Sequence, residues 1–161
     1  MTNARALKQS FQNWSPITLS NFRVLSPSVF ASEQISLEDV GTAKTAGITT
    51  IVNNRPDGEE PSAPQSAEIE AEAKAAGLSY VSIPIGHSGF SEHQVDAMIE
   101  ALDKAEGAVL AYCRSGTRST FLWALAQAKL GSDPDAITQA AMSAGYDVSP
   151  IRPMMDMLAA R

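Results

Sequence analysis

Short apolar runs alternate with helix-forming segments along most of this chain. Residues 48–53, 78–83 and 108–112 are rich in β-branched or apolar side chains, which are typical of buried strands. The stretches between them are rich in Ala and Glu and end at glycines, as helices commonly do. Because parallel strands need a crossover connection, usually a helix, this order favours a parallel sheet with helices on its faces.

Further elements are expected on either side of this alternation. Residues 21–32 indicate two short strands around a Ser-Pro turn. Ser36 begins a capping pattern that predicts a helix ending at Gly47. Two more helices are expected over about residues 119–130 and 134–144. We therefore expect an α/β fold with a mostly parallel sheet of about four or five strands and helices on both faces.

The length and charge indicate a single globular domain that does not bind nucleic acid. The 161 residues suit one domain, expected over residues 14–148, with an N-terminal arm over 1–13 and a C-terminal tail over 149–161. The net charge of −6 disfavours a nucleic-acid partner, which normally requires a basic surface. No apolar run approaches the ~20 residues that a membrane span needs, so no membrane partner is expected.

The single cysteine excludes an internal disulfide framework. A cytoplasmic, reducing location is therefore expected. Two histidines and one cysteine show no spacing that suggests a metal site, and no cofactor is expected. The sequence leaves open whether the chain forms a homo-oligomer.

The segment from Cys113 to Arg118 combines the groups that a nucleophilic anion site needs. It joins an expected strand to an expected helix, whose unpaired first N–H groups point toward a bound anion. Gly116 permits a sharp turn, and Arg114 and Arg118 add positive charge. A thiol in such a field ionises readily. The alternative is a buried structural cysteine, but two arginines and a glycine in a tight turn are poor core material.

We therefore expect Cys113 to be the nucleophile and Arg118 the main oxyanion clamp. The backbone amides expected to complete the anion site belong to Arg114, Ser115, Gly116, Thr117 and Ser119.

Two other loops on the same edge of the sheet carry further candidates. Asp57 is a candidate acid, and the alternative is that it caps its own backbone in an Asp-Gly turn. Arg55 either contacts substrate or, as we favour, pairs with Glu59 and Glu60 in an acidic loop, where Glu59 is a minor acid candidate. His87 is a candidate acid or substrate contact, although most loop histidines are neither.

Two segments carry a resemblance to a known family. Asn54-Arg55-Pro56-Asp57-Gly58-Glu59 and Tyr112-Cys113-Arg114-Ser115-Gly116-Thr117-Arg118-Ser119 resemble the phosphatase-like domain of the beta-lactamase-hydrolase-like proteins. This bacterial family is also described as sulfur transferases and is related to dual-specificity, protein-tyrosine-phosphatase-like enzymes. The resemblance covers roughly residues 14–148. It implies a three-layer phosphatase-like fold and a Ser119 hydroxyl that supports the thiolate.

Three departures from ordinary tyrosine phosphatases bear on mechanism. Cys113 and Arg118 enclose four residues, whereas those enzymes have five, and the shorter loop resembles that of rhodanese sulfurtransferases. Tyr112 precedes the cysteine, where dual-specificity phosphatases usually have histidine. Their general acid is an aspartate in the loop after the strand that corresponds to residues 78–83. Here that loop offers His87, with Glu92 just beyond, and no aspartate.

Three functions follow from these observations. The first is a phosphatase-like hydrolase that cleaves a phosphomonoester through a phosphocysteine on Cys113, with Arg118 and Asp57 as its other catalytic residues. The alternative is a rhodanese-type sulfurtransferase that forms a persulfide on Cys113 from thiosulfate or a low-molecular-weight persulfide. The third is a non-catalytic domain that binds oxyanions.

Overall fold

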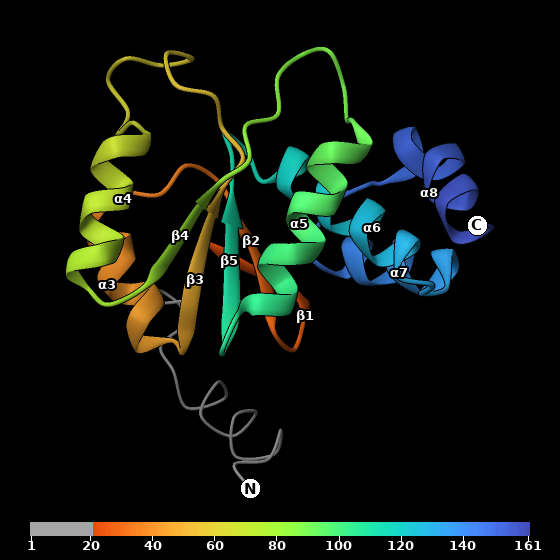
Figure 1. The fold of residues 1–161 in the computed structure, drawn as a ribbon, viewed down its shortest axis with the longest axis horizontal. Coiled ribbons are helices and arrows are strands. Elements are labelled where there is room, and N and C mark those ends of the chain that lie inside the picture. The colour runs from red at the N-terminus through yellow and green to blue at the C-terminus, as the bar shows by residue number, and fades with distance from the viewer. Residues whose placement is uncertain (1–20) are drawn as a thin grey trace, which may run out of the picture.

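Five strands form one sheet at the centre of the computed structural model, which describes residues 21–161 (Figure 1). The strands are β1 Phe22–Ser26, β2 Val29–Ser32, β3 Ile48–Asn53, β4 Ser79–Ser82 and β5 Ala108–Tyr112. Their order across the sheet is β1-β2-β5-β3-β4. β1 runs antiparallel to β2, and the other neighbours are parallel. The predicted fold class is confirmed, while the expected arm over residues 1–13 lies outside the described residues.

Helices cover both faces of the sheet (Figure 1). One face carries α3 and α4, and the other carries the remaining helices. Within residues 21–161, no helix is both long and apolar enough to cross a membrane. The helices are α3 Leu37–Thr45, α4 Ser66–Ala75, α5 Glu92–Lys104, α6 Thr117–Lys129, α7 Pro134–Ser143, the short 3-10 helix η1 Ser149–Ile151 and α8 Arg152–Ala159.

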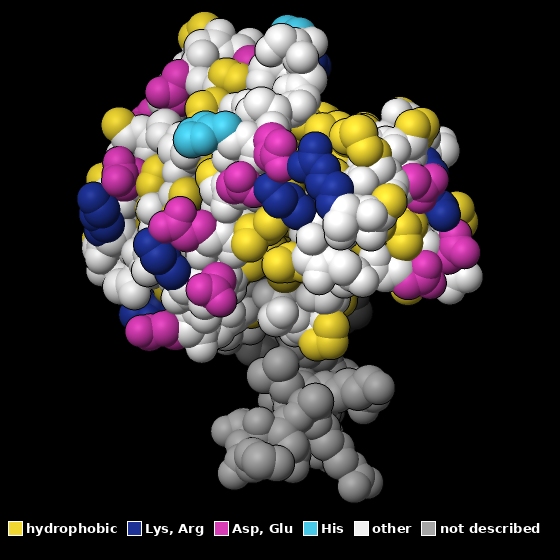
Figure 2. Space-filling view, turned by 45° about the vertical axis from the view of Figure 1, so that its right-hand side comes forward, with side chains coloured by type: hydrophobic (Ala, Val, Ile, Leu, Met, Phe, Trp, Pro, Cys, Tyr) yellow, Lys and Arg dark blue, Asp and Glu magenta, His cyan; other side chains and the backbone are white. Residues whose placement is uncertain are grey.

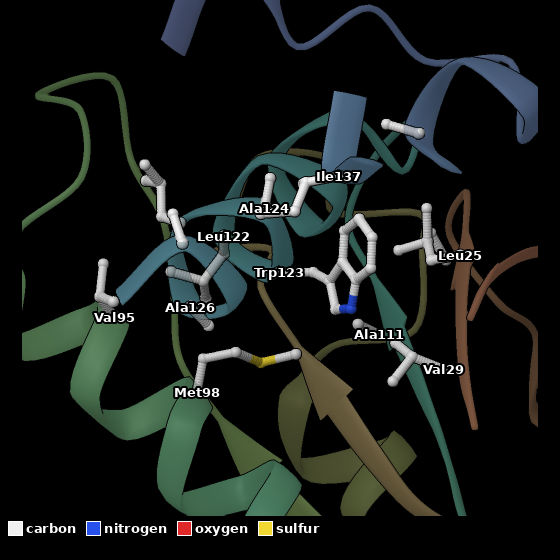
Figure 3. Packing of buried hydrophobic residues seen from close by; sticks show 14 of the residues in the cluster. Leu25, Val29, Val95, Met98, Ala111, Leu122, Trp123, Ala124, Ala126 and Ile137 are labelled. Atoms are coloured by element: carbon white, nitrogen blue, oxygen red, sulfur yellow. The ribbon is translucent and has the colours of Figure 1, made fainter. Parts of the chain in front are cut away.

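Two hydrophobic cores lie on opposite faces of the sheet. In the larger core, Trp123 of α6 packs among side chains from α5, α7 and the sheet, such as Met98, Ile137 and Val29 (Figure 3). The smaller core joins β3 and β5 to α3 and α4. Each fully buried side chain of this size contributes about 1.5–3 kcal/mol, so both helical layers are held firmly on the sheet.

Local sequence signals explain where several helices begin. Ser36 Oγ accepts a hydrogen bond from the Asp39 N–H at 3.1 Å, and Asp39 Oδ2 accepts from the Ser36 N–H at 2.8 Å. Ser91 and Gln94 form the same reciprocal pair at the start of α5. These two boxes fix the directions of α3 and α5. The helix expected from about residue 119 instead begins at Thr117.

The C-terminal residues 149–161, expected as a tail, continue the larger core. They form η1 and α8, and Met155 and Leu158 are buried within that core. Met157 on the same helix is 53% exposed. Helix α8 thus packs with its apolar face inward, against α6 and α7.

Candidate active site

The carboxyl ends of β3 and β5 lie side by side, because the two strands are parallel neighbours. Asn53 pairs in register with Tyr112, so Asn54 and Cys113 leave the sheet at the same edge. The Asn54 N–H donates to the Tyr112 carbonyl at 2.8 Å. Since ligands of parallel sheets bind beyond the carboxyl ends of the strands, this edge is the candidate site.

Cys113 lies at the base of the loop that joins β5 to α6. Its side chain is buried, and its Sγ accepts a hydrogen bond from the Gly116 N–H at 3.1 Å. Gly116 has a φ of 93°, in the left-handed region that favours glycine, and it caps α6. The turn folds the loop back around the sulfur. A backbone donor aimed at Sγ stabilises negative charge there.

The first turn of α6 supplies further donors beside this sulfur. The first intrahelical bond runs from the Thr120 N–H to the Gly116 carbonyl at 2.9 Å. The N–H groups of Arg118 and Ser119 precede it, so they lack an acceptor within the helix. The Arg118 and Ser119 amides therefore lie at a helix N-terminus in the segment that follows Cys113, where such N–H groups can bind an anion.

Arg118 presents its guanidinium to Glu59 rather than to open solvent. Its Nη1 donates to Glu59 Oε2 at 2.7 Å, and its Nη2 donates to Glu59 Oε1 at 2.9 Å. The same Nη1 also donates to the Ile85 carbonyl at 2.7 Å. The Glu59 carboxylate raises the pKa of Arg118, and the nearby Cys113 adds to the rise. The Arg118 guanidinium is thus held in place and is already paired with an anion, the Glu59 carboxylate.

Arg55 anchors the acidic loop at this edge. Its side chain is only 7% exposed, and its Nε donates to Glu59 Oε1 at 2.9 Å. Its Nη2 lies 3.4 Å from Glu60 Oε1, and its Nη1 donates to Gln34 Oε1 at 3.0 Å. The structure contains the favoured pairing of Arg55 with the acidic loop. Glu59 therefore bridges two arginines, and these contacts, led by the hydrogen bond from Arg118, lower its pKa to about 2.

A cleft of about 380 Å³ opens above the Arg118–Glu59 pair. Three arginines and two glutamates contribute to its walls, so the wall charges nearly balance. His87 reaches it from the loop after β4. The lining residues are Arg55, Glu59, Glu60, His87, Arg114 and Arg118. Within residues 21–161, no three His, Cys, Asp or Glu side chains converge as metal ligands.

Asp57 lies outside the lining of this cleft. Its Oδ1 accepts a hydrogen bond from the Ser66 N–H at 2.8 Å, at the start of α4. It lines a separate small hollow together with Pro64 and Gln65. Asp57 therefore caps the start of α4 rather than its own backbone. The structure does not bring Asp57 to Arg118. Glu59, two residues further along the loop, stands there instead.

Ser119 bonds to Asn54, not to the sulfur. Its Oγ donates to Asn54 Oδ1 at 2.7 Å, while Asn54 Nδ2 donates to the Ile83 carbonyl at 2.9 Å. Because the amide nitrogen already serves as a donor to Ile83, the oxygen must accept, and the single Ser119 hydroxyl proton is used there. This corrects the expectation that the Ser119 hydroxyl supports the Cys113 thiolate. The buried pair instead ties α6 to β3.

Tyr146 contacts the loop between Cys113 and α6, and the sequence did not predict this contact. Its hydroxyl donates to the Ser115 carbonyl at 3.2 Å, and its ring lies against Gly116. Arg23 of β1 lies over the ring, 5.9 Å from its centre. Burial raises the pKa of Tyr146. Nothing in the local sequence after α7 indicates this contact, because it depends on how α7 packs against the sheet.

The mostly parallel sheet with helices on both faces matches the fold of protein-tyrosine-phosphatase-like domains. The solved structure of Tk-PTP aligns with a TM-score of 0.67 and 16% identity, covering 88% of this chain and 97% of that chain. At that identity the likeness concerns the fold alone.

The chain belongs to the family of the phosphatase-like domain of beta-lactamase hydrolase-like proteins, which matches residues 21–130. The beta-lactamase hydrolase-like protein of Xylella fastidiosa is 41% identical over 81 residues, which make up 50% of this chain and 19% of that protein. The chain thus matches about a fifth of the length of this relative. A protein of Neisseria meningitidis, described as a candidate phosphatase, is 33% identical, with a TM-score of 0.74 over 84% of this chain and 96% of that chain.

Proposed function

We propose that this protein is a cysteine-dependent hydrolase of phosphomonoesters, with Cys113 as the nucleophile. The observation that carries the proposal is the position of Cys113 Sγ at the start of α6, 3.1 Å from the Gly116 nitrogen. Arg118, in the first turn of the same helix, offers a planar fork that matches two phosphoryl oxygens. Membership of a phosphatase-like family supports the same chemistry.

The reaction has two steps that balance without an oxidant or a metal ion. The Cys113 thiolate attacks phosphorus, so an S–P bond forms while the P–O bond to the leaving group breaks. The leaving oxygen takes the electron pair of that bond and one proton. Water then attacks phosphorus, the S–P bond breaks, and inorganic phosphate and the thiolate result.

The remaining groups bind and orient the phosphoryl group in this proposal. The loop amides hold its nonbridging oxygens, where charge is present throughout the reaction. His87 and Arg114 line the outer cleft and contact the rest of the substrate. Arg55 positions Glu59 through their 2.9 Å bond. The amide donors to the phosphoryl oxygens are those of Arg114, Ser115, Thr117 and Ser119, while the Gly116 N–H donates to Cys113 Sγ.

A rhodanese-type sulfur transfer is the second candidate, favoured by the short loop between Cys113 and Arg118. The Cys113 thiolate attacks the outer sulfur of thiosulfate, an S–S bond forms, and sulfite leaves with the electron pair of the broken S–S bond. Cyanide or an acceptor thiolate then removes that sulfur and restores the thiolate. Sulfite needs little protonation to leave, so this route makes a smaller demand on a general acid.

The test compares wild-type protein with Cys113→Ser on both substrates. We expect phosphate release from an aryl phosphate by the wild type and only background release by Cys113→Ser. Inorganic phosphate should still bind the variant within a few-fold of the wild-type affinity, since the amides and Arg118 remain. Full hydrolytic activity in Cys113→Ser would contradict the proposal. Thiocyanate formed from thiosulfate and cyanide, without aryl phosphate hydrolysis, would favour the second candidate.

A further inference from the structure

The oxyanion clamp is occupied by a carboxylate of the chain itself. Both terminal nitrogens of Arg118 donate to Glu59, at 2.7 and 2.9 Å. This is the paired geometry with which an arginine holds two oxygens of a phosphoryl group. One fork cannot hold both anions in this way. A phosphoryl group that binds this same Nη1–Nη2 edge of Arg118 must therefore displace Glu59.

A displaced Glu59 carboxylate stays close to the substrate. Arg55 holds its Oε1 at 2.9 Å, and the Arg55 side chain is itself 7% exposed and further bonded to Gln34. The Glu59 side chain is 20% exposed and lies in the wall of the cleft. Loss of the Arg118 contact alone thus leaves Glu59 tethered to Arg55 in the wall of the cleft.

Displacement also changes the affinity of Glu59 for a proton. Its hydrogen bond from Arg118 is the largest cause of its low pKa. Once a phosphoryl group takes that hydrogen bond, this cause disappears. A phosphate dianion beside the carboxylate raises the pKa of Glu59 further, because like charges disfavour ionisation. Binding of a phosphoryl group to Arg118 therefore raises the pKa of Glu59, so that Glu59 can hold a proton.

We propose that Glu59 is the proton donor of the reaction, released from Arg118 when the phosphoryl group of the substrate binds. This role rests on the proposed hydrolysis. The substrate enters as the monoanion, whose proton has a pKa near ~6, and that proton moves to Glu59. Glu59 gives it to the leaving oxygen as the P–O bond breaks. The Glu59 carboxylate then takes a proton from the water that attacks phosphorus and passes it to the product. Phosphate departs as its monoanion, and the Glu59 carboxylate returns to Arg118.

Glu59 has a competitor for this role in His87, which lines the same cleft. The direct contact with Arg118 favours Glu59, because Arg118 holds the oxygens bonded to the reacting phosphorus. Asp57 is less suitable, since it is bonded to the start of α4. Variants of these residues separate the three acids experimentally.

The experiment measures kcat/KM for a series of phosphomonoesters whose leaving groups differ in pKa. Glu59→Gln keeps the shape of the side chain but cannot donate an acidic proton. We expect little loss with nitrophenyl-type leaving groups and a loss of about 10²–10⁴-fold with alkyl leaving groups. Glu100→Gln is the matched control, because Glu100 is a carboxylate of α5 that pairs with Lys104 and does not line the cleft. It should keep the wild-type dependence on the leaving group.

A second readout tests the displacement itself. Inorganic phosphate should bind Glu59→Gln about 10-fold more tightly than wild type, because the internal competitor no longer carries charge. Equal slowing of all esters in Glu59→Gln, or a steep dependence that appears in His87→Asn instead, overturns the assignment of Glu59 while hydrolysis stands. Failure of the wild-type protein to hydrolyse any ester overturns the proposed function as well.

Discussion

Through one side chain, Arg118 connects the Cys113 loop to the acidic loop after β3 and to the loop after β4. Its terminal nitrogens bond both oxygens of Glu59 and the Ile85 carbonyl. A lysine at this position keeps a positive charge but loses the fork. Loss of one charge-assisted hydrogen bond corresponds to about 1.5–3 kcal/mol.

We therefore expect Arg118→Lys to weaken binding of inorganic phosphate by roughly 10–100-fold, as measured by titration calorimetry. Arg152→Lys is the control, because Arg152 pairs with Asp135 and Asp156 on α7 and α8. Unchanged affinity in Arg118→Lys would show that another arginine holds the anion.

The Glu59 carboxylate also links stability to pH. Its pKa falls from 4.5 to about 2 in the folded protein. A lowered pKa stabilises the fold above about 4.5, and this contribution is lost as pH falls from about 4.5 toward about 2. Urea unfolding of wild type and Glu59→Gln at several pH values measures it. The wild-type advantage should shrink over that range, and a constant difference would contradict the ion-pair explanation.

The sequence predicted where the residues of the Cys113 loop lie more reliably than which side chains they contact. The roles assigned to Cys113, Gly116 and Arg118 depend on one contiguous loop, and such a loop has few ways to fold between a strand and a helix. The choice between Asp57 and Glu59 depends on how the twelve-residue, proline-containing loop over residues 54–65 crosses the sheet edge. Both carboxylates lie in it, and the bond from the Ser66 N–H, nine residues after Asp57, separates them.

Elements with strong local signals were predicted nearly to the residue. The capping boxes at Ser36 and Ser91 and the glycines after the helices mark ends that depend on neighbours in sequence. The start of α6 was placed two residues late, because the sequence signal there is a turn glycine without a capping side chain. Strand order could not be predicted, since β5 pairs with β2 and β3, which lie far apart in sequence.

The loop before α6 depends on close packing between Gly116 and Tyr146. A Cβ at Gly116 would overlap the Tyr146 hydroxyl and ring, and the φ of 93° disfavours any L side chain. The left-handed backbone alone costs roughly 1–2 kcal/mol. We expect Gly116→Ala to lower the free energy of unfolding by more than that and to reduce turnover.

A double-mutant cycle with Tyr146→Ala isolates the steric part. The destabilisation caused by Gly116→Ala should be smaller in the Tyr146→Ala background. Equal destabilisation in both backgrounds would mean that Tyr146 does not press against the loop.

At the scale of the whole molecule, α8 is part of the larger core. Met155 is fully buried, whereas Met157 on the same helix is 53% exposed. Met155→Ala should reduce the free energy of unfolding by about 2–5 kcal/mol, and Met157→Ala should change it by less than about 0.5 kcal/mol. Chemical denaturation of the two variants measures both. Equal effects would indicate that α8 does not pack on α6 as described.

The cleft carries nearly balanced charge, with three arginines and two glutamates in its walls. Acidic and basic side chains are interspersed on the face in Figure 2. The chain has a net charge of −6, yet three arginines line the cleft. Anion binding at this site therefore depends on placed donors at short range rather than on an attractive field of the whole protein.

The most direct test is the intact mass of the protein, quenched rapidly after mixing with an aryl phosphate or with thiosulfate. We predict a transient adduct with the mass of one phosphoryl group in the wild type and none in Cys113→Ser. A stable gain of one sulfur atom from thiosulfate, with no phosphoryl adduct during turnover, would contradict the hydrolase and identify Cys113 as a persulfide carrier. Turnover of the ester by Cys113→Ser would contradict both.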